Sequence, residues 1–220
     1  MASDSQPRTE LASVVRREFL QGASWLAGAV VLGSSGALLT ACSSKEPEAP
    51  PAAPAATGKV PGLTGTAYVK GDAGYEAARE AAIWVGNKPK RYPAMIVFPK
   101  NAQEVAAAVN FAREQKLRVG VRSGGHSWTA SGVQEGSLLI DLFAWNEVKI
   151  DAASKTAWVQ PGTQAGAFNE ALNKQGFAFP TAHASHVSLG GFLICGGFGR
   201  HSREWGIGCE NVLEVECVNA

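Results

Sequence analysis

The sequence predicts an α+β fold for the part of the chain from residue 92 onward. Short apolar runs alternate with helical patterns, a hairpin pattern follows them, and two glycine-rich loops interrupt the frame. Apolar residues make up 45% of the 220 residues, which is enough to bury a core in one or two domains. The net charge is only +1, so the composition favours neither a nucleic-acid partner nor an acidic one. The four cysteines have no zinc-like spacing, and we expect no metal site.

The first elements predict a strand–helix–strand unit. Tyr75 to Ile83 has apolar residues at helical spacing, and Met95 to Phe98 is a short apolar run typical of a buried strand. Asn101 can cap the next helix, with Glu104 as its capping-box partner. Arg118 to Val121 is the following strand, and elements this close in sequence form a βαβ unit with parallel strands.

The remaining elements predict a third strand, a hairpin, a helix and a last strand. The third strand is Leu138 to Asp141. Val148 to Asp151 and Thr156 to Val159 flank a tight turn, as in a hairpin. A helix is expected over residues 163–175, with a glycine directly after it as its C-terminal stop. Val212 to Val218 is expected to be the last strand.

Two glycine-rich loops are the candidate ligand sites. The first, residues 122–127, follows a parallel strand, and ligands bind at the carboxyl ends of such strands. Gly124 and Gly125 let backbone N–H groups converge on an anion such as a diphosphate. The second loop, residues 188–199, begins with Ser188, which can cap a short helix facing a phosphate. Neither loop is a Walker A motif or a dinucleotide fingerprint, so on chemistry alone both could equally be structural turns.

Several motifs in a fixed order separate these alternatives. They are V-R-S-G-G-H-S at 121–127, V-Q-P-G at 159–162, the stretch 187–199, W-G-I-G at 205–208 and N-V at 211–212. With these motifs the stretch from residue 92 to 220 resembles the FAD-binding domain of the vanillyl-alcohol-oxidase/p-cresol-methylhydroxylase (PCMH-type) superfamily. Within that superfamily it is most similar to the berberine-bridge-enzyme-like oxidases. The resemblance implies two α/β subdomains: a small parallel βαβ sheet, and a mixed sheet flanked by helices.

The resemblance also implies FAD as cofactor and a covalent bond from His126 to the flavin 8α-methyl carbon. A neutral imidazole nitrogen is a suitable nucleophile for this bond. The alternative interpretation of His126 is a solvated loop histidine with no role in binding. Ala184 stands where many relatives have a second, cysteine attachment, so a single bond is expected. Cys195 is expected to be a packed, unreactive thiol. The expected cofactor-binding residues are Arg122, Ser123, Gly124, Gly125, His126, Ser127, Ser188, Gly190, Gly191, Gly196, Gly197, Ile207 and Val212.

The implied activity is that of an oxidase or dehydrogenase. FAD takes a hydride from a small organic donor, such as a sugar, an alcohol or a lactone, and passes electrons to O₂ or another acceptor. Family members carry a substrate domain after the FAD domain, so we expect this chain to be a fragment that lacks it, and no catalytic base is assigned. His183, His186, His201 and Arg203 are expected to be structural or solvated. The alternative function is an exported binding or assembly lipoprotein on a disabled flavin fold.

The N-terminus is typical of an export signal. Arg16 and Arg17 precede an apolar run from Ala23 to Ala41, which ends in L-T-A-C at Cys42. Residues 1–42 therefore predict a twin-arginine signal with a lipobox, lipidation of Cys42, and a periplasmic or cell-surface location with a lipid anchor. A single signal-anchor helix is the alternative. Residues 43–61 are a Pro/Ala-rich linker, residues 62–91 a connecting segment, and residues 92–220 the FAD-binding domain.

Overall fold

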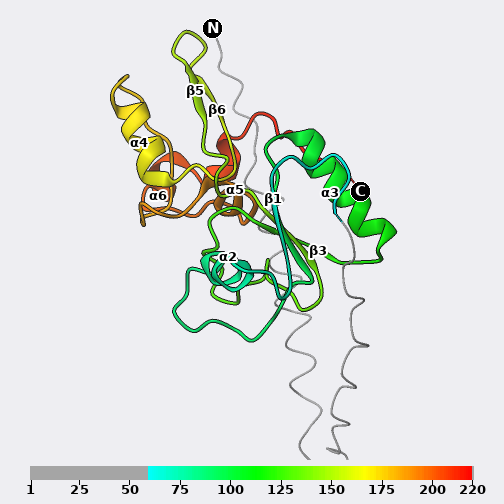
Figure 1. Ribbon diagram of the computed structural model, residues 1–220. Helices are drawn as coiled ribbons and strands as arrows, with labels where there is room; N and C mark the ends of the chain where they lie inside the picture. Colours follow the sequence, from blue (N-terminus) through cyan, green and yellow to red (C-terminus); the bar gives the residue numbers. More distant parts are fainter. Residues whose placement is uncertain (1–58, 220) are drawn as a thin grey trace, which may run out of the picture. The chain divides into compact units, whose positions relative to one another are not determined.

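The computed structural model of the protein describes residues 59–219 (Figure 1). The predicted export signal, Cys42 and all but the end of the predicted linker lie outside the described residues. No helix within residues 59–219 is long and apolar enough to cross a membrane.

A four-stranded sheet forms the first layer. Its strands, in spatial order, are β1 (Thr66–Val69), β2 (Met95–Phe98), β4 (Leu138–Asp141) and β3 (Val119–Arg122). β2 and β3 both run parallel to β4, whereas β1 is antiparallel to β2. The parallel strand–helix–strand unit is therefore confirmed, but β4 lies between its two strands. β1 adds an edge that the sequence reading did not predict.

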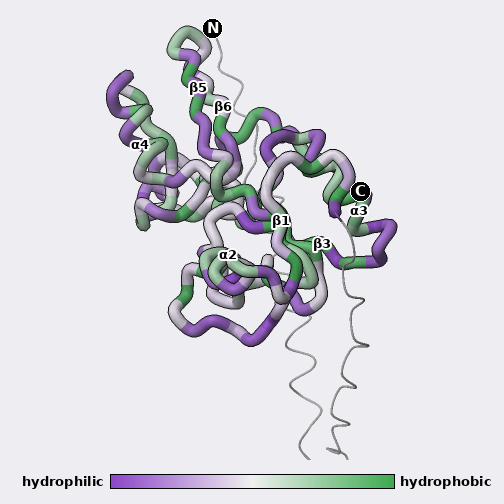
Figure 2. Tube along the Cα trace, in the orientation of Figure 1, coloured by the Kyte–Doolittle hydropathy of each residue, from purple (hydrophilic) through white to green (hydrophobic). Residues whose placement is uncertain are grey.

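The central strands β2 and β4 of the sheet are buried on both faces. Met95 and Val97 of β2 pack with α3 (Ala102–Glu114) through Ala108, while Ile96 lies in a second cluster with Tyr75 of α2 (Tyr75–Ala81). Alternate residues of a strand point to opposite faces, so a strand covered on both sides reads as a continuous apolar run. In Figure 2 hydrophobic segments lie near the β3 label, and hydrophilic segments are frequent in the loop below α2.

The start of α3 is tied to β1 by one carboxylate. Asn101 Oδ1 accepts the backbone N–H of Glu104 at 2.9 Å, as the capping pattern predicts. The Glu104 carboxylate does not close the capping box but turns toward the residues just before β1. It accepts hydrogen bonds from Thr64 Oγ1 at 2.6 Å, Lys100 N at 3.0 Å and Gly65 N at 3.2 Å. These hydrogen bonds, led by that from Thr64, lower the pKa of Glu104 to about 2.

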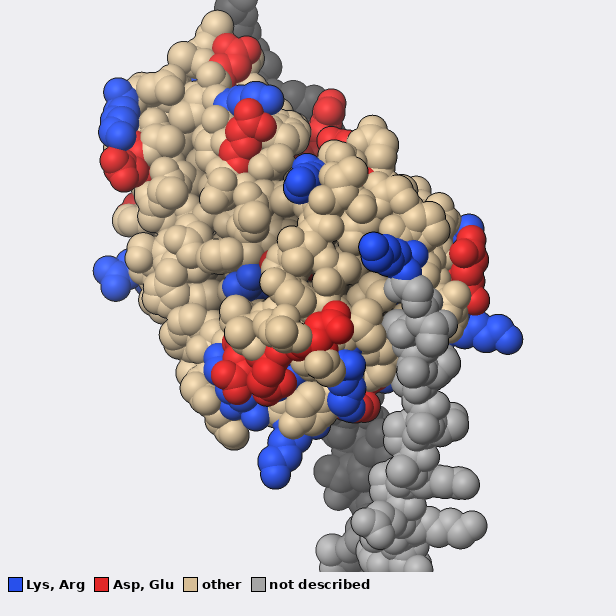
Figure 3. Space-filling model, viewed as in Figure 1, with Lys and Arg blue, Asp and Glu red and all other residues tan. Residues whose placement is uncertain are grey.

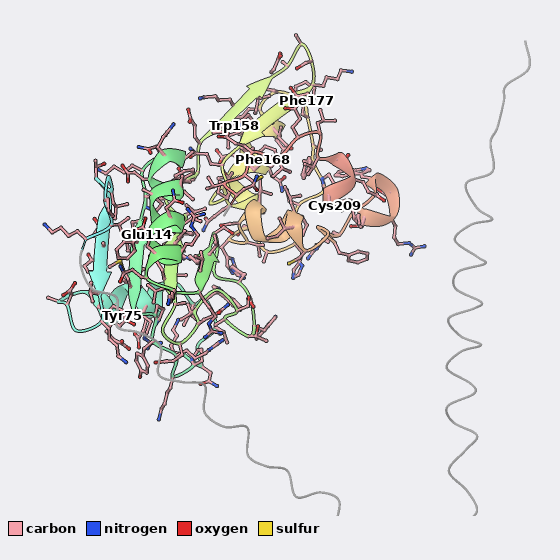
Figure 4. All side chains as sticks on the ribbon, turned by 90° about the vertical axis from the view of Figure 1, so that its right-hand side faces the viewer. Tyr75, Glu114, Trp158, Phe168, Phe177 and Cys209 are labelled. Carbon is pink, nitrogen blue, oxygen red and sulfur yellow. The ribbon has the colours of Figure 1, made fainter. Side chains whose placement is uncertain are left out.

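A hairpin and a helix form a separate core. β5 (Val148–Asp151) and β6 (Thr156–Val159) pair antiparallel as predicted, and α4 (Ala165–Asn173) packs Phe168 and Leu172 against them. Figure 4 shows Phe168, Phe177 and Trp158 in this part of the protein, and Tyr75 and Glu114 in the part with the four-stranded sheet. α5 (Leu189–Ile194), α6 (Ser202–Trp205) and the 3₁₀ helix η1 (Gly208–Asn211) follow. Charges of both signs are interspersed on the face shown in Figure 3.

Two expectations for these elements need correction. The segment 212–218 is not a strand: it has no hydrogen-bonded neighbour strand among the described residues, and Leu213 and Val215 are 80% and 73% exposed. An alternating pattern cannot form a strand without a partner edge. The helix expected over 163–175 begins at Ala165, because Gln164 forms a β-bridge with Ser188. Gly176, with φ of +75°, follows the helix end as predicted.

Candidate cofactor site

The first glycine loop is anchored at its start by a buried ion pair. Arg122 Nη1 lies 3.0 Å from both carboxylate oxygens of Asp141, and Nη2 donates to the carbonyl of Ala81 at 3.1 Å. The guanidinium also lies over the ring of Phe143, 4.1 Å from its centroid. Arg122 Nε is buried, with no hydrogen-bond partner among residues 59–219. These contacts make Arg122 an anchor that fixes the loop between β4 and the end of α2.

The two glycines of the loop are required by close backbone approaches. A Cβ on Gly124 would lie 2.9 Å from Ser188 Oγ. A Cβ on Gly125 would lie 2.5 Å from the Ala82 carbonyl oxygen, and the φ of Gly125 is +72°. The Gly125 carbonyl accepts the backbone N–H of Trp84 at 3.0 Å. Only glycine therefore lets the loop lie against the chain that follows α2.

The loop leaves a row of backbone donors free. Among the hydrogen bonds of residues 59–219, none uses the N–H groups of Gly124, Gly125, His126 or Ser127. Successive N–H groups without protein acceptors form an anion-binding concavity. The loop can therefore hold a diphosphate, as its sequence predicts.

The second glycine loop meets the first. Gly191 N donates to Ser123 Oγ at 3.0 Å, which joins α5 to the first loop. Ser188 occupies the N-cap position of α5, but its hydroxyl donates to the Gly162 carbonyl at 3.0 Å and caps no helix N–H. The expected side-chain cap is therefore wrong, because the buried Gly162 carbonyl takes the hydroxyl. A Cβ on Gly190 would lie 2.7 Å from Pro161 Cβ, so this glycine lets α5 lie against the end of β6.

The rest of the second loop packs on η1. Cys209 N donates to the Gly196 carbonyl at 3.2 Å, and Gly208 N donates to the Gly197 carbonyl at 2.8 Å. Gly196 and Gly197 both have positive φ. The other predicted residues of this region, Ile207 and Val212, flank η1 and are half-buried. Cys195 is exposed and not packed as expected, because it ends α5 on the side that faces solvent.

His126 lies in a cluster of aromatic rings. It stacks on Trp84 with ring centroids 4.5 Å apart and planes at 24°, and it contacts His186 at 4.6 Å and 48°. Trp128 meets Trp84 edge-on at 5.8 Å. Burial lowers the pKa of His126, and the nearby basic groups of His186 and Arg122 lower it further. The lowered pKa favours the neutral imidazole, in which a ring nitrogen has a free lone pair.

Sequence reasoning missed two members of this cluster. Trp84 is 48% exposed and stacks on His126. His186 was expected to be structural or solvated; it is exposed, yet its ring contacts both His126 and Trp84. No local sequence signal marks either residue, because both contacts depend on the tertiary path of the chain. Within residues 59–219, no three potential metal ligands come together.

The domain family described as "FAD binding domain" matches residues 93–220. The chain belongs to this family. Its cofactor is FAD, and the row of free N–H groups between two closely packed glycine loops fits the diphosphate of that cofactor.

Similar proteins include FAD-linked oxidoreductases. One from Dictyostelium discoideum is 37% identical over 127 residues, which are 58% of this chain and 28% of the relative. The uncharacterized FAD-linked oxidoreductase YvdP of Bacillus subtilis is 36% identical over 160 residues, which are 72% of this chain and 35% of the relative. The chain thus spans about a third of the length of these relatives.

Solved structures confirm the α+β, PCMH-type fold. The 6-hydroxy-D-nicotine oxidase of Arthrobacter nicotinovorans is 29% identical with a TM-score of 0.64, over 69% of this chain and 33% of that one. The grass pollen allergen Phl p 4, which has glucose dehydrogenase activity, is also 29% identical with a TM-score of 0.64, over 67% of this chain and 32% of that one. The narrower likeness to berberine-bridge-enzyme-like oxidases stays a prediction.

Proposed function

We propose that the protein is an FAD-dependent oxidoreductase that holds its cofactor through a covalent bond from His126. Its donor is a small organic molecule oxidised at a C–H or CH–OH group, such as a sugar, an alcohol or a lactone. The observation that carries the proposal is a half-buried imidazole, stacked on Trp84, at the end of a loop with free N–H groups. Burial lowers the pKa of this imidazole and so favours its neutral form. When bound, FAD accepts a hydride from the donor and passes electrons to O₂ or another acceptor.

The residues proposed to bind FAD divide into two groups by what they do. Gly124, Gly125 and Ser127 offer backbone N–H groups to the diphosphate, and the N–H group of His126 adds a fourth. Residues such as Ser123 and Ser188 hold the two loops together, so that these donors stay aimed at one place. Preorganised donors bind an anion without losing conformational freedom on binding.

His126 supplies the nucleophile for attachment. Its neutral ring forms a C–N bond to the flavin 8α-carbon, in place of one C–H bond of that methyl group. The two hydrogens, one from the methyl group and one from the imidazole N–H, leave as two protons and two electrons, and O₂ or another acceptor takes the electrons. Stacking on Trp84 restricts the rotation of the ring, so the reacting nitrogen keeps one direction. Ala184 offers no second nucleophile, so a single attachment is proposed.

Replacement of His126 by Ala tests the attachment. After acid precipitation of the protein, flavin should remain with the wild-type pellet and be lost from His126→Ala. Some non-covalent FAD should still bind to the variant, because the backbone donors of the loop are unchanged. His183→Ala removes an exposed histidine elsewhere and is the matched control. Acid-stable flavin in His126→Ala would show that this residue is not the tether.

The donor class is supported by what similar proteins are named for. A 6-hydroxy-D-nicotine oxidase and an allergen with glucose dehydrogenase activity both resemble this chain. Flavin reduction by a panel of sugars, alcohols and lactones, followed by its absorbance, tests the proposal. A protein that carries FAD but is reduced by none of them would contradict the donor class.

We also propose that the protein is exported by the twin-arginine route and anchored by lipid at Cys42. The proposal is supported by Arg16 and Arg17, the apolar run that follows them and the L-T-A-C ending. Replacement of both arginines by lysine should leave the precursor in the cytoplasm. Normal export of that variant would refute the route, and loss of lipid labelling in Cys42→Ser tests the anchor separately.

A further inference from the structure

The proposed attachment leaves His186 without a role, although its ring contacts the tether. The ring centroids of His126 and His186 lie 4.6 Å apart, and that of His186 lies 5.6 Å from that of Trp84. With 4.5 Å between His126 and Trp84, the three rings form a triangle in which each ring contacts the other two. Two separate parts of the chain therefore limit the positions open to the His126 imidazole.

The backbone on both sides of His186 is fixed to the start of α4. The Ser185 carbonyl accepts Gly166 N at 2.8 Å, and the Val187 carbonyl accepts Ala165 N at 2.9 Å. A Cβ on Gly166 would lie 2.9 Å from Ser185 Cβ, so only glycine allows this approach without a shift. His186 is thus presented from a braced segment, even though its side chain is exposed.

Trp84 is braced in a similar way on the other side. Its backbone N–H donates to the Gly125 carbonyl, within the loop that carries His126. Movement of the Trp84 backbone is therefore coupled to movement of the loop. The ring of His186 is the third member of the triangle. On that side the His126 imidazole is held only by its contact with His186.

The basic groups that face His126 are His186 and Arg122. The charge of Arg122 is neutralised by Asp141, which binds it bidentately, whereas no ion pair is found for His186 within residues 59–219. A protonated His186 therefore opposes protonation of His126 at short range. A nucleophilic imidazole must be unprotonated, so this repulsion favours the reactive form.

We propose that His186 is a positioning residue for covalent attachment of the flavin: its ring, which contacts the rings of both His126 and Trp84, fixes the orientation of the His126 imidazole. The inference rests on the proposed attachment at His126. It adds a second histidine that forms no bond to the cofactor but sets the rate and the pH range in which the bond forms.

Two substitutions separate the ring from the charge. His186→Ala removes both, whereas His186→Phe keeps an aromatic ring in the triangle and removes the charge. His201→Phe is the matched control, because His201 stacks on Trp205 at 4.3 Å and 19° far along the chain from the tether. The whole protein is produced without flavin and mixed with FAD at several pH values between about 5 and 8, which span the titration of an ordinary imidazole. Acid-stable flavin is measured over time, and the dissociation constant of non-covalent FAD is measured separately.

We expect His186→Ala to slow attachment at least about tenfold at every pH, since a loosely held nucleophile spends less time in the reactive orientation. His186→Phe should attach flavin at nearly the wild-type rate at pH 8. Its rate should fall off at a higher pH than that of the wild type, because loss of a facing positive charge raises the pKa of His126. Affinity for non-covalent FAD should be unchanged in both variants, which a general folding defect would not leave intact.

Each other outcome overturns the proposal in a distinguishable way. Wild-type rates and the wild-type pH midpoint in both variants would refute the role of His186, while the tether at His126 would stand. Equal slowing by His201→Phe would show a general sensitivity to replacement of a stacked histidine and would also refute it. If the wild type itself forms no acid-stable flavin, the proposed attachment and this inference both fall.

Discussion

The glycine at position 125 should be far less replaceable than another glycine with the same backbone conformation. Gly125 and Gly176 have φ values of +72° and +75°, so alanine at either position costs about 1–2 kcal/mol of left-handed strain. Around Gly176 a Cβ would meet nothing within 4 Å, whereas at Gly125 it would lie 2.5 Å from the Ala82 carbonyl oxygen. Relief of that clash moves the loop away from Trp84. The shift weakens one backbone hydrogen bond and one ring contact, each of which contributes about 0.5–1.5 kcal/mol.

Gly176→Ala should therefore lower the free energy of unfolding by about 1–2 kcal/mol, and Gly125→Ala by about 2–5 kcal/mol. Urea unfolding of both variants, followed by tryptophan fluorescence at one temperature, gives the comparison. Gly125→Ala should also reduce acid-stable flavin, because the loop that carries His126 has moved, whereas Gly176→Ala should not. Equal losses of stability in the two variants would mean that the first glycine loop can shift without loss of stability. The loop would then not depend on the close approach of Gly125 to Ala82.

Two further predictions concern the carboxylates that brace the sheet. Asp141→Asn should destabilise the protein by about 3–5 kcal/mol in urea unfolding, because it leaves the charge of Arg122 nearly buried without a counter-ion; a loss below about 1 kcal/mol would contradict this anchor role. Glu104, with a pKa of about 2, contributes stability that is present above the ordinary pKa of about 4.3 and is lost as the pH falls toward 2. Glu104→Gln should therefore melt at a lower temperature than the wild type at pH 7, with the difference shrinking toward pH 2.5; a constant difference between these pH values would refute the linkage.

The buried strands could be predicted from the sequence because their environment is recorded in their own residues. Met95 to Phe98 is apolar throughout and Leu138 to Asp141 is apolar up to its last residue, as expected for parallel strands covered on both faces. β1, Thr66–Val69, was missed because an edge strand lacks this signature: its first two residues are exposed and its last two are half-buried. The position of β1 is fixed by its pairing with β2 and by the hydrogen bonds that Thr64 and Gly65, just before the strand, donate to Glu104. Neither interaction is visible as a local sequence pattern.

The wrong strand at 212–218 shows the opposite error. Leu213, Val215 and Cys217 alternate with Glu214 and Glu216, which is a strand pattern, but all five side chains are exposed. Alternation of apolar and polar residues indicates that a segment can form a strand with one apolar face. Whether it does so depends on a second edge, which nothing within the segment encodes.

The same distinction runs through the site. The positive φ of Gly125 belongs to the local turn, and the motif around it predicts a diphosphate site, although the close approaches to Gly124 and Gly125 come from Ser188 and Ala82. The lowered pKa of His126 is different, because it depends on burial and on a histidine presented from the segment before α5. A motif can therefore identify the nucleophile without identifying what makes it reactive. The two residues proposed to tune the attachment, Trp84 and His186, lie outside the motif that contains His126, and substitution at either position should alter attachment while the R-S-G-G-H sequence stays intact.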